Sequence, residues 1–262
     1  MQLHAAAAVL GPGGTLLVYG AKDEGIRGVL NHTEDLFPSG KTIAVGGRCR
    51  MVRSERRREL RGLRGALEDW KEIFPPDHPL LPPLWVSYPG VFAHGRLDSG
   101  TKLLLEAMPP LPSGARILDY GCGSGFLASV ARLKGEDLTM DMLDSDAVAL
   151  EAARENVPGA RVLLQEGLPD PDGVPYEAIV SNPPFHRGKR EESGLILEMI
   201  RGAPGLLTRE GKLLFVSQRR FQVREALEQN FSRVSVAADD SGFRVWVGEG
   251  PRQSSQEGHH GP

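Results

Sequence analysis

The stretch that decides the fold is 114–125, which reads Gly-Ala-Arg-Ile-Leu-Asp-Tyr-Gly-Cys-Gly-Ser-Gly. Its apolar first half, placed ahead of a glycine cluster, predicts a buried strand, and the apolar residues 126–134 predict a helix after the turn. Glycines in such a turn let the backbone approach a ligand closely, and the helix N-terminus offers unpaired N–H groups to an anion. The stretch therefore predicts a strand, a ligand-binding turn and a helix, in that order.

Further strands and helices alternate after this unit. Strands are predicted at 138–143, 161–165, 176–181 and 212–217, and helices at 147–156, 193–207 and 223–231. Two more segments alternate in the manner of a hairpin and are placed at 233–237 and 243–248. This order predicts an α/β fold with a doubly wound, mostly parallel, seven-stranded sheet that has an antiparallel end.

The first part of the chain is similar to its last part. Residues 10–19 align with 207–216, because each carries a glycine turn followed by an apolar strand. Each stretch continues into an amphipathic segment ending at Phe37 or Phe231, and then into two short strands, at 42–45 with 49–52 and at 233–237 with 243–248. We therefore predict that 1–55 is the remnant of a second copy of the same α/β domain. The alternative is that any late strand-helix unit of such a sheet carries this kind of turn.

The composition is typical of soluble globular proteins. Hydrophobic residues make up 40% and charged residues 25%, no apolar run approaches the roughly 20 residues of a membrane span, and the first residues lack the basic segment of a signal peptide. Cys49 and Cys122 are too few for a disulfide framework, which favours a cytoplasmic location. The histidines and cysteines show no metal-ligand spacing, so no metal is expected. Residues 251–262 are polar and aperiodic and are expected to form a disordered tail, and the oligomeric state stays open.

Positive charge gathers in one part of the chain. Eight arginines against two glutamates between Arg48 and Arg64 give a local charge of +6, in a chain whose net charge is −3. A basic block on an acidic body favours a polyanionic partner such as nucleic acid. The alternative is a solvated arginine-rich helix face, because leucines recur at helical spacing beside the charges. We accordingly expect a basic helix and linker at 56–85.

An acidic residue, Asp144, follows the strand predicted at 138–143. In nucleotide-binding α/β folds a residue at this place accepts hydrogen bonds from ribose hydroxyls. The alternative is a helix-capping role, since a predicted helix follows closely. The dinucleotide fingerprint Gly-x-Gly-x-x-Gly is not matched, because Gly125 comes one residue early, and this argues against a nicotinamide cofactor.

The sharpest signal is 181–186, Ser-Asn-Pro-Pro-Phe-His, at the end of a predicted strand. Its prolines stiffen the loop and leave carbonyl groups free to accept hydrogen bonds. The Asn182 oxygen and a proline carbonyl can both accept from an exocyclic amine, and Phe185 offers a face for a planar base. Because the loop ends a parallel strand, it lies at the same sheet edge as the glycine turn. The alternative is a plain Asn-Pro-Pro turn.

Together, the segment 119–125, Asp144 and the loop 182–185 resemble the class I S-adenosylmethionine-dependent methyltransferases that act on planar amino groups. The upstream stretch 89–105, Pro-Gly-Val-Phe-Ala-His-Gly-Arg-Leu-Asp-Ser-Gly-Thr-Lys-Leu-Leu-Leu, narrows the resemblance to the bacterial small-subunit ribosomal RNA guanine-N2 methyltransferases. The resemblance covers 86–248.

This resemblance implies a methyltransferase sheet with a catalytic domain at 86–250. That family carries two tandem methyltransferase-like domains, the first without cofactor binding, which agrees with a remnant at 1–55, although most of the first domain is missing. The chain also departs from the family pattern in having Glu177 where such strands often start with Asp, and an acidic stretch at 137–146.

The resemblance further implies S-adenosylmethionine as cofactor. The residues expected to shape or close its pocket are Asp119, Gly121, Gly123, Gly125, Asp144, Glu166, Phe92, Asp98, Gly100 and Thr101. Of these, Asp144 would bind the ribose, Glu166 or its neighbour Gly167 would lie near the adenine, and the last four would close over the methionine end. The catalytic loop would be Asn182, Pro183, Pro184 and Phe185, and ribosomal RNA or the small ribosomal subunit would bind Arg56, Arg57, Arg58 and Arg187.

Two other functions stay open at this point. The loop suits any planar amine, so adenine N6 or a protein glutamine amide are alternative acceptors, although enzymes of those kinds more often carry Tyr than Phe at the position of Phe185. A different class is a catalytically weak RNA-binding module, because most of the partner domain is absent. Cofactor binding and the identity of the methylated product separate these alternatives.

Overall fold

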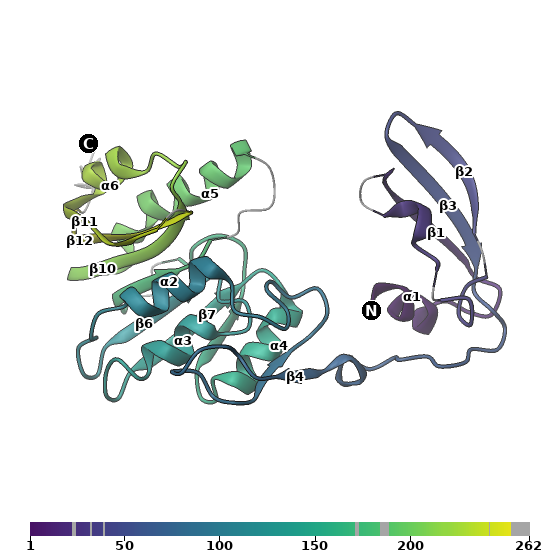
Figure 1. The fold of residues 1–262 in the computed structure, drawn as a ribbon, viewed down its shortest axis with the longest axis horizontal. Coiled ribbons are helices and arrows are strands. Elements are labelled where there is room, and N and C mark those ends of the chain that lie inside the picture. The colour runs from purple at the N-terminus through teal and green to yellow at the C-terminus, as the bar shows by residue number, and fades with distance from the viewer. Residues whose placement is uncertain are drawn as a thin grey trace, which may run out of the picture. The chain divides into compact units, whose positions relative to one another are not determined.

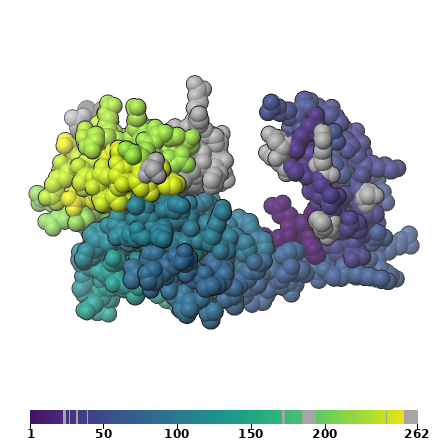
Figure 2. All heavy atoms as spheres, viewed as in Figure 1, coloured from purple at the N-terminus to yellow at the C-terminus, as the bar shows by residue number. Residues whose placement is uncertain are grey.

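The computed structural model describes residues 1–22, 25–31, 33–38, 40–170, 173–183, 189–240 and 242–252. The chain divides into two compact units, Met1–Lys71 and Glu72–Pro262. The first is drawn in purple to dark blue and the second in blue to yellow (Figures 1 and 2).

The second unit is built on a seven-stranded sheet in the order β11-β12-β10-β9-β6-β7-β8. Its strands are β6 (Arg116–Tyr120), β7 (Thr139–Asp144), β8 (Arg161–Leu164), β9 (Tyr176–Ser181), β10 (Leu207–Gln218), β11 (Phe231–Asp239) and β12 (Phe243–Pro251). β10, β9, β6, β7 and β8 run parallel to one another, whereas β12 is antiparallel to both of its neighbours. The predicted doubly wound sheet with an antiparallel end is confirmed.

Helices cover both faces of this sheet (Figure 1). One face packs against α2 (Ser99–Ala107), α3 (Phe126–Ala131) and α4 (Ala147–Asn156), and the other against α5 (Lys189–Gly202), the 3₁₀ helix η4 (Ala203–Gly205) and α6 (Arg224–Asn230). Side chains of β6 alternate between the two cores, because Ile117 lies in the first and Leu118 in the second, and neither is exposed. A short antiparallel pair, β4 (Glu72–Phe74) and β5 (Trp85–Ser87), precedes α2.

Aspartates set the starts of two helices beside the sheet edge. The Asp98 side chain accepts a hydrogen bond from the Thr101 backbone N–H at the start of α2, and Asp146 accepts one from Val148 at the start of α4. Such caps satisfy N–H groups that have no partner within the helix. They fix the first turns of α2 and α4 close to the strand ends that carry the predicted site.

The first unit holds a smaller sheet of three antiparallel strands, β1-β3-β2. Its elements are α1 (Gln2–Val9), β1 (Thr15–Ala21), the 3₁₀ helices η2 (Ile26–Gly28) and η3 (Leu67–Trp70), β2 (Lys41–Gly46) and β3 (Cys49–Glu55). The order and directions match those of β10-β12-β11, and even the irregularity recurs, between Thr42 and Ala44 in β2 and between Val236 and Ala238 in β11. This agrees with the predicted partial copy of the same fold.

The two copies differ in how one sheet face is covered. Leu214 and Val216 of β10 are fully buried in the core beneath α2. Their counterparts in the repeat alignment, Leu17 and Tyr19 of β1, are 54% and 67% exposed. Within the described residues, the first unit thus keeps only the core on the opposite face, which includes Phe37 and Val52.

The basic helix predicted at 56–85 is wrong. All of these residues are described, and they hold only η3, β4 and the first residue of β5. Arg56 donates to the backbone carbonyl of Ala7 at 2.9 Å, and Arg57 donates to that of Glu34. These arginines fasten an extended segment across the first unit, and glycines at 62 and 65 further disfavour a helix.

Other expectations concern single features of the chain. No helix in the described part of the chain is both long enough and apolar enough to cross a membrane. Cys49 and Cys122 are free thiols. The predicted tail begins at Pro251, which the structure places at the end of β12, and 253–262 lie outside the described residues.

Candidate active site

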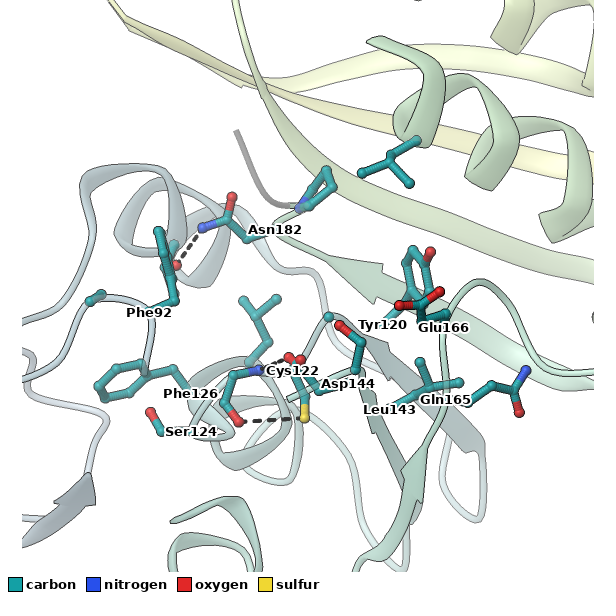
Figure 3. A pocket seen from close by; sticks show the side chains of 18 of the residues that line it. Phe92, Tyr120, Cys122, Ser124, Phe126, Leu143, Asp144, Gln165, Glu166 and Asn182 are labelled. Atoms are coloured by element: carbon teal, nitrogen blue, oxygen red, sulfur yellow. Dashed lines mark hydrogen bonds between the residues drawn. The ribbon is translucent and has the colours of Figure 1, made fainter. Parts of the chain in front are cut away.

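A pocket of about 300 Å³ lies at the carboxyl ends of the central parallel strands. Its walls come from the glycine loop after β6, from residues after β7 and β8, from the end of β9, and from the segment that leads into α2. Figure 3 shows Asn182 and Phe92 at one end of the pocket, Gln165 and Glu166 at the other, and Asp144 between them. Loops at the carboxyl ends of the strands are where open α/β sheets bind ligands, as the sequence predicted.

The three glycines of the loop after β6 have two different functions. All adopt positive φ angles, 69° for Gly121, 53° for Gly123 and 93° for Gly125. A Cβ atom added at Gly121 or Gly123 would meet nothing within 4 Å, and both residues line the pocket. A Cβ atom at Gly125 would lie 2.9 Å from the side chain of Val157, so this glycine permits close packing rather than ligand approach.

Asp144 ties the glycine loop to the loop after β7. Its carboxylate accepts from the Gly123 N–H at 2.8 Å and from the Asp146 N–H at 2.9 Å, and its side chain lines the pocket. The cap of α4 is Asp146, not Asp144. The helix-capping alternative is therefore wrong for Asp144, which leaves its carboxylate placed to accept from a ligand.

Asp119 lies beneath the glycine loop and does not appear among the residues that line the pocket. It is fully buried, and one carboxylate oxygen accepts from the Ala128 N–H at 3.0 Å while the other has no partner within the described residues. Burial, reinforced by the negative charge of Asp144, raises the pKa of Asp119 from 3.8 to about 7, against the opposing effect of the Ala128 hydrogen bond.

This pKa predicts a pH dependence of stability. Because the folded state holds the Asp119 proton more tightly than the unfolded state, the free energy of unfolding should fall as pH rises from 3.8 to about 7. The slope from this one group is at most about 1.4 kcal/mol per pH unit. Urea unfolding at several pH values should show that Asp119→Asn, which carries no charge, removes this slope. Parallel pH profiles for the two proteins would contradict the assignment.

Four residues meet at the Asn182 end of the pocket: Phe92, Thr101, Asn182 and Pro183 all line it. The Asn182 amide nitrogen donates to Asp98 Oδ2 at 2.9 Å and to Thr101 Oγ1 at 2.8 Å. Its oxygen, Oδ1, is buried and has no hydrogen-bond partner in the part of the chain that the structure describes. The structure thus presents an acceptor without a donor, at the place where the sequence predicts a planar amine.

The opposite end of the pocket combines polar and apolar side chains. Glu166 and its neighbour Gly167 both line it, so the two residues that the sequence left as alternatives lie at the same place. Tyr120, Leu143 and Gln165 also line the pocket and were not predicted. Their only signal in the sequence is adjacency, because they flank Gly121, Asp144 and Glu166 at the strand ends.

Two more of the predicted site residues lie outside the pocket lining, and three cannot be placed. Asp98 and Gly100 do not line the pocket. Asp98 caps α2, and Gly100 packs closely, because a Cβ atom there would lie 3.3 Å from the ring of Phe243. Pro184, Phe185 and Arg187 lie outside the described residues.

A group of side chains that the sequence did not single out supports the glycine loop from behind. The indole N–H of Trp85 donates to Ser124 Oγ at 3.0 Å, and its ring stacks on Phe126 with centroids 4.4 Å apart. Asn156 donates to the carbonyl oxygens of Val86 and Ser124, at 2.8 and 3.0 Å. These hydrogen bonds fasten β5 and α4 to the loop, so they fix the backbone that faces the pocket.

Comparison with protein families identifies the domain that contains this pocket. Residues 84–247 match the model of the methyltransferase small domain family. The chain belongs to this family. The ribosomal RNA small subunit methyltransferase C of Chromohalobacter salexigens is 35% identical over 256 residues, covering 93% of this chain and 72% of that protein. The protein of the same name from Shewanella piezotolerans is 29% identical, covering 90% of this chain and 69% of its own length.

A solved structure supports the fold of this methyltransferase. The T. thermophilus 16S rRNA N2 G1207 methyltransferase, in complex with AdoMet and guanosine, matches with a TM-score of 0.78. It is 22% identical and the match covers 94% of this chain and 67% of that chain. At this identity the likeness concerns the fold, and it includes both units because nearly the whole chain is matched.

Within this methyltransferase, the described residues that the sequence assigned to the cofactor form two groups. Those that line the pocket are Phe92, Thr101, Gly121, Gly123, Asp144 and Glu166. Asp98, Gly100, Asp119 and Gly125 are placed around them, in helix caps and tight packing. Among the described residues, no group of three or more His, Cys, Asp and Glu side chains is placed to hold a metal ion.

Proposed function

We propose that this methyltransferase transfers a methyl group from S-adenosylmethionine to the exocyclic N2 amine of a guanine in ribosomal RNA of the small subunit, in the cytoplasm. The observation that carries the proposal is the buried, unpartnered Asn182 Oδ1 at the end of the pocket. A buried acceptor without a donor costs free energy that a ligand N–H would recover. The names of the relatives support ribosomal RNA of the small subunit as the substrate. The resemblance of the motifs to guanine-N2 methyltransferases supports guanine as that ligand, and the structure with the same fold was solved with guanosine bound.

The residues of the pocket fit S-adenosylmethionine. The open faces of Gly121 and Gly123 allow a ligand to lie directly against the backbone, where any side chain would fill the space. Asp144 offers carboxylate oxygens to ribose hydroxyls, and Tyr120 and Leu143 add apolar surface beside Glu166 for a purine ring. Thr101 and Phe92 would then enclose the methionine end.

The chemistry requires orientation more than a strong base. S-adenosylmethionine supplies the methyl group, which is activated because it is bound to a positively charged sulfur. A guanine amine is a poor nucleophile, since its lone pair is delocalised into the ring. Asn182 Oδ1 and the Pro183 carbonyl would accept from its two N–H groups, turn the lone pair toward the methyl group, and stabilise the charge that develops on nitrogen. The nitrogen becomes acidic as the methyl group transfers, so its proton can then leave to solvent.

Asp144 should control cofactor affinity. We expect Asp144→Ala to raise the Kd for S-adenosylmethionine about 10- to 100-fold, since a hydrogen bond to a charged group is worth about 1.5–3 kcal/mol. Isothermal titration calorimetry measures this change. Asp146→Ala is the matched control, because it removes a carboxylate two residues away that caps α4 and lies outside the pocket lining. An unchanged Kd for Asp144→Ala would show that Asp144 only links the loops after β6 and β7 and does not bind the cofactor.

We assign the RNA-facing surface to the basic first unit. Met1–Lys71 contains 12 basic and 8 acidic residues, whereas the rest of the chain contains 19 basic and 26 acidic residues. Because Arg56 and Arg57 are engaged with backbone carbonyls, their replacement would disturb the fold as well as the charge. Arg58 and Arg61 are exposed and are the better probes.

Replacing Arg58 and Arg61 with alanine should weaken RNA binding and reduce the slope of log K against log salt by about 0.7–0.9 for each phosphate that is no longer neutralised. Fluorescence anisotropy with a labelled ribosomal RNA fragment, over a range of salt concentrations, measures both effects. The control replaces Arg201 and Arg209, two arginines of the second unit, with alanine, so that the same charge is removed elsewhere. Equal slopes for the two double variants would place RNA binding outside the basic segment.

Identification of the methylated nucleoside tests the function as a whole. Small ribosomal subunits and naked ribosomal RNA are incubated with the protein and S-adenosylmethionine, and the digested nucleosides are identified by mass spectrometry. We expect N2-methylguanosine. Methyladenosine alone, or methylation of a protein glutamine, would overturn guanine as the acceptor, and RNA binding without any methyl transfer would indicate a binding module.

A further inference from the structure

The amide of Asn182 is held by side chains from a distant part of the sequence. Asn182 follows β9, whereas Asp98 and Thr101 belong to the start of α2, more than eighty residues earlier. Asp98 Oδ2 accepts from the Asn182 amide nitrogen at 2.9 Å, from the Thr101 backbone N–H at 2.9 Å and from Thr101 Oγ1 at 3.3 Å. Thr101 Oγ1 also accepts from the Asn182 amide nitrogen at 2.8 Å. A single carboxylate oxygen therefore joins the helix cap to the catalytic loop.

This arrangement decides which end of the Asn182 amide is free. An ionised carboxylate only accepts hydrogen bonds, so the side of the amide that faces Asp98 must be its NH₂ group. The Thr101 hydroxyl donates its hydrogen to Asp98, so its oxygen can accept a hydrogen bond from the second amide hydrogen of Asn182. The carbonyl oxygen must then point away from both, and it is the buried atom that has no partner within the described residues.

Asp98 also changes how well that oxygen accepts. A hydrogen bond from the amide N–H to a carboxylate polarises the amide and makes its oxygen a stronger acceptor, as in other hydrogen-bonded chains. The effect is useful in the transition state, when the acceptor amine acquires positive charge and its N–H groups become stronger donors. Gly100 allows this tight first turn, because a Cβ atom there would lie 3.2 Å from Asp98 Oδ2.

We propose that Asp98 and Thr101 are positioning residues for the methyl acceptor: they hold Asn182 with its carbonyl directed at the acceptor amine. The proposal rests on the proposed function, because it assumes that Asn182 binds the amine. It moves the main role of Asp98 from the methionine end of the cofactor, where the resemblance places it, to the orientation of the acceptor. Thr101 takes part from the pocket wall, where its hydroxyl oxygen accepts from the Asn182 amide.

Conservative substitutions separate this role from simple folding. Asp98→Asn and Asp98→Ser keep a residue that caps helices well, and Thr101→Ser keeps the hydroxyl. We expect Asp98→Ser and Thr101→Val each to lower kcat about 100-fold, as expected for a reacting group misplaced by about 1 Å. Asp98→Asn should lower kcat less, because its amide oxygen can still accept from Asn182 and only the charge is lost. Thr101→Ser, which keeps the hydroxyl, should recover most of the rate that is lost in Thr101→Val. The Kd for S-adenosylmethionine should change less than about twofold in the two Asp98 variants, because Asp98 does not line the pocket.

A double-mutant cycle with Asn182→Ala tests whether the residues act through Asn182. Single-turnover methyl transfer to ribosomal RNA and calorimetric cofactor binding are measured for the wild type, Asp98→Ser, Asn182→Ala and the double variant. If Asp98 acts through Asn182, its replacement has no further effect once Asn182 is absent. Multiplicative effects on the rate, or loss of cofactor affinity in Asp98→Ser, would overturn the proposal. The wild-type arm reports on the proposed function separately, through the nucleoside that it methylates.

Discussion

Replacing Asn182 with alanine is expected to lower kcat about 10²- to 10³-fold, the usual cost of removing one preorganised hydrogen-bonding group from a transition state. The Kd for S-adenosylmethionine should change less than about twofold, because Asn182 interacts with the acceptor and not with the cofactor. The reason is geometric. Asn182 Oδ1 is buried at the pocket end with no protein donor among the described residues, so its contribution appears only when the acceptor amine arrives.

The measurement combines single-turnover methyl transfer with calorimetric cofactor binding. Asp144→Ala is the informative comparison, because it should show the opposite pattern, a raised Kd with a smaller effect on the rate at saturating cofactor. Asn182→Asp is a second probe, since its carboxylate would face Asp98 without the amide hydrogens that now join the two side chains. Loss of rate and of cofactor affinity in equal measure for Asn182→Ala would show that the residue is structural.

The parts of the fold that the sequence predicts well are those governed by local pattern. The strand at 176–181 and the helix at 147–156 are confirmed at both ends, because apolar runs and helix formers there meet clear stops. The sheet order of the first unit follows from the repeat, since similar strands in the same order adopt the same pairing. Residues at strand ends are also predictable, because the carboxyl edge of a parallel sheet gathers them at one place.

Interactions between distant segments were not predictable. Nothing near Asp98 in the sequence shows that its carboxylate meets Asn182, and the glycine spacing does not show that Gly125 is needed for packing against Val157. The prediction of a basic helix was wrong for the same reason. The spacing of the leucines indicated a helix, but Arg56 and Arg57 donate to backbone carbonyls of other segments, which the local sequence does not reveal. Tertiary hydrogen bonds decide such cases, and a single sequence does not display them.

The acidic stretch at 137–146 and the unusual Glu177 also have a structural explanation. Asp141, in the middle of β7, is 1% exposed and accepts from Arg116 Nη2 at 2.7 Å and from the Tyr176 hydroxyl at 2.7 Å. Glu177 accepts from the Arg116 backbone N–H at 2.6 Å, and the Arg116 guanidinium lies over the ring of Tyr176 at 4.4 Å. These groups tie the starts of β6 and β9 to the middle of β7, and none of them lines the pocket.

The largest expected effect on stability is that of Arg116→Met. Removing this partner leaves the Asp141 charge buried, which typically costs about 3–5 kcal/mol of unfolding free energy. Urea unfolding measures the change, and amide exchange in β6 and β7 assigns the transition to the second unit. Arg161→Ala is the matched control, because its guanidinium lies 3.8 Å from the same oxygen but is 56% exposed, and such pairs contribute at most about 1 kcal/mol.

The cause can be separated from lost packing by adding Asp141→Asn. An amide at this position can still accept from Tyr176 but carries no charge, so Arg116→Met should cost much less in the Asp141→Asn background than in the wild type. We expect a coupling free energy of about 1–3 kcal/mol, within the range found for residues of one hydrogen-bonded network. If the two substitutions were additive, the stability would come from the packing of the Arg116 side chain on Tyr176. Since none of these residues lines the pocket, the Kd for S-adenosylmethionine should stay unchanged in every member of the cycle.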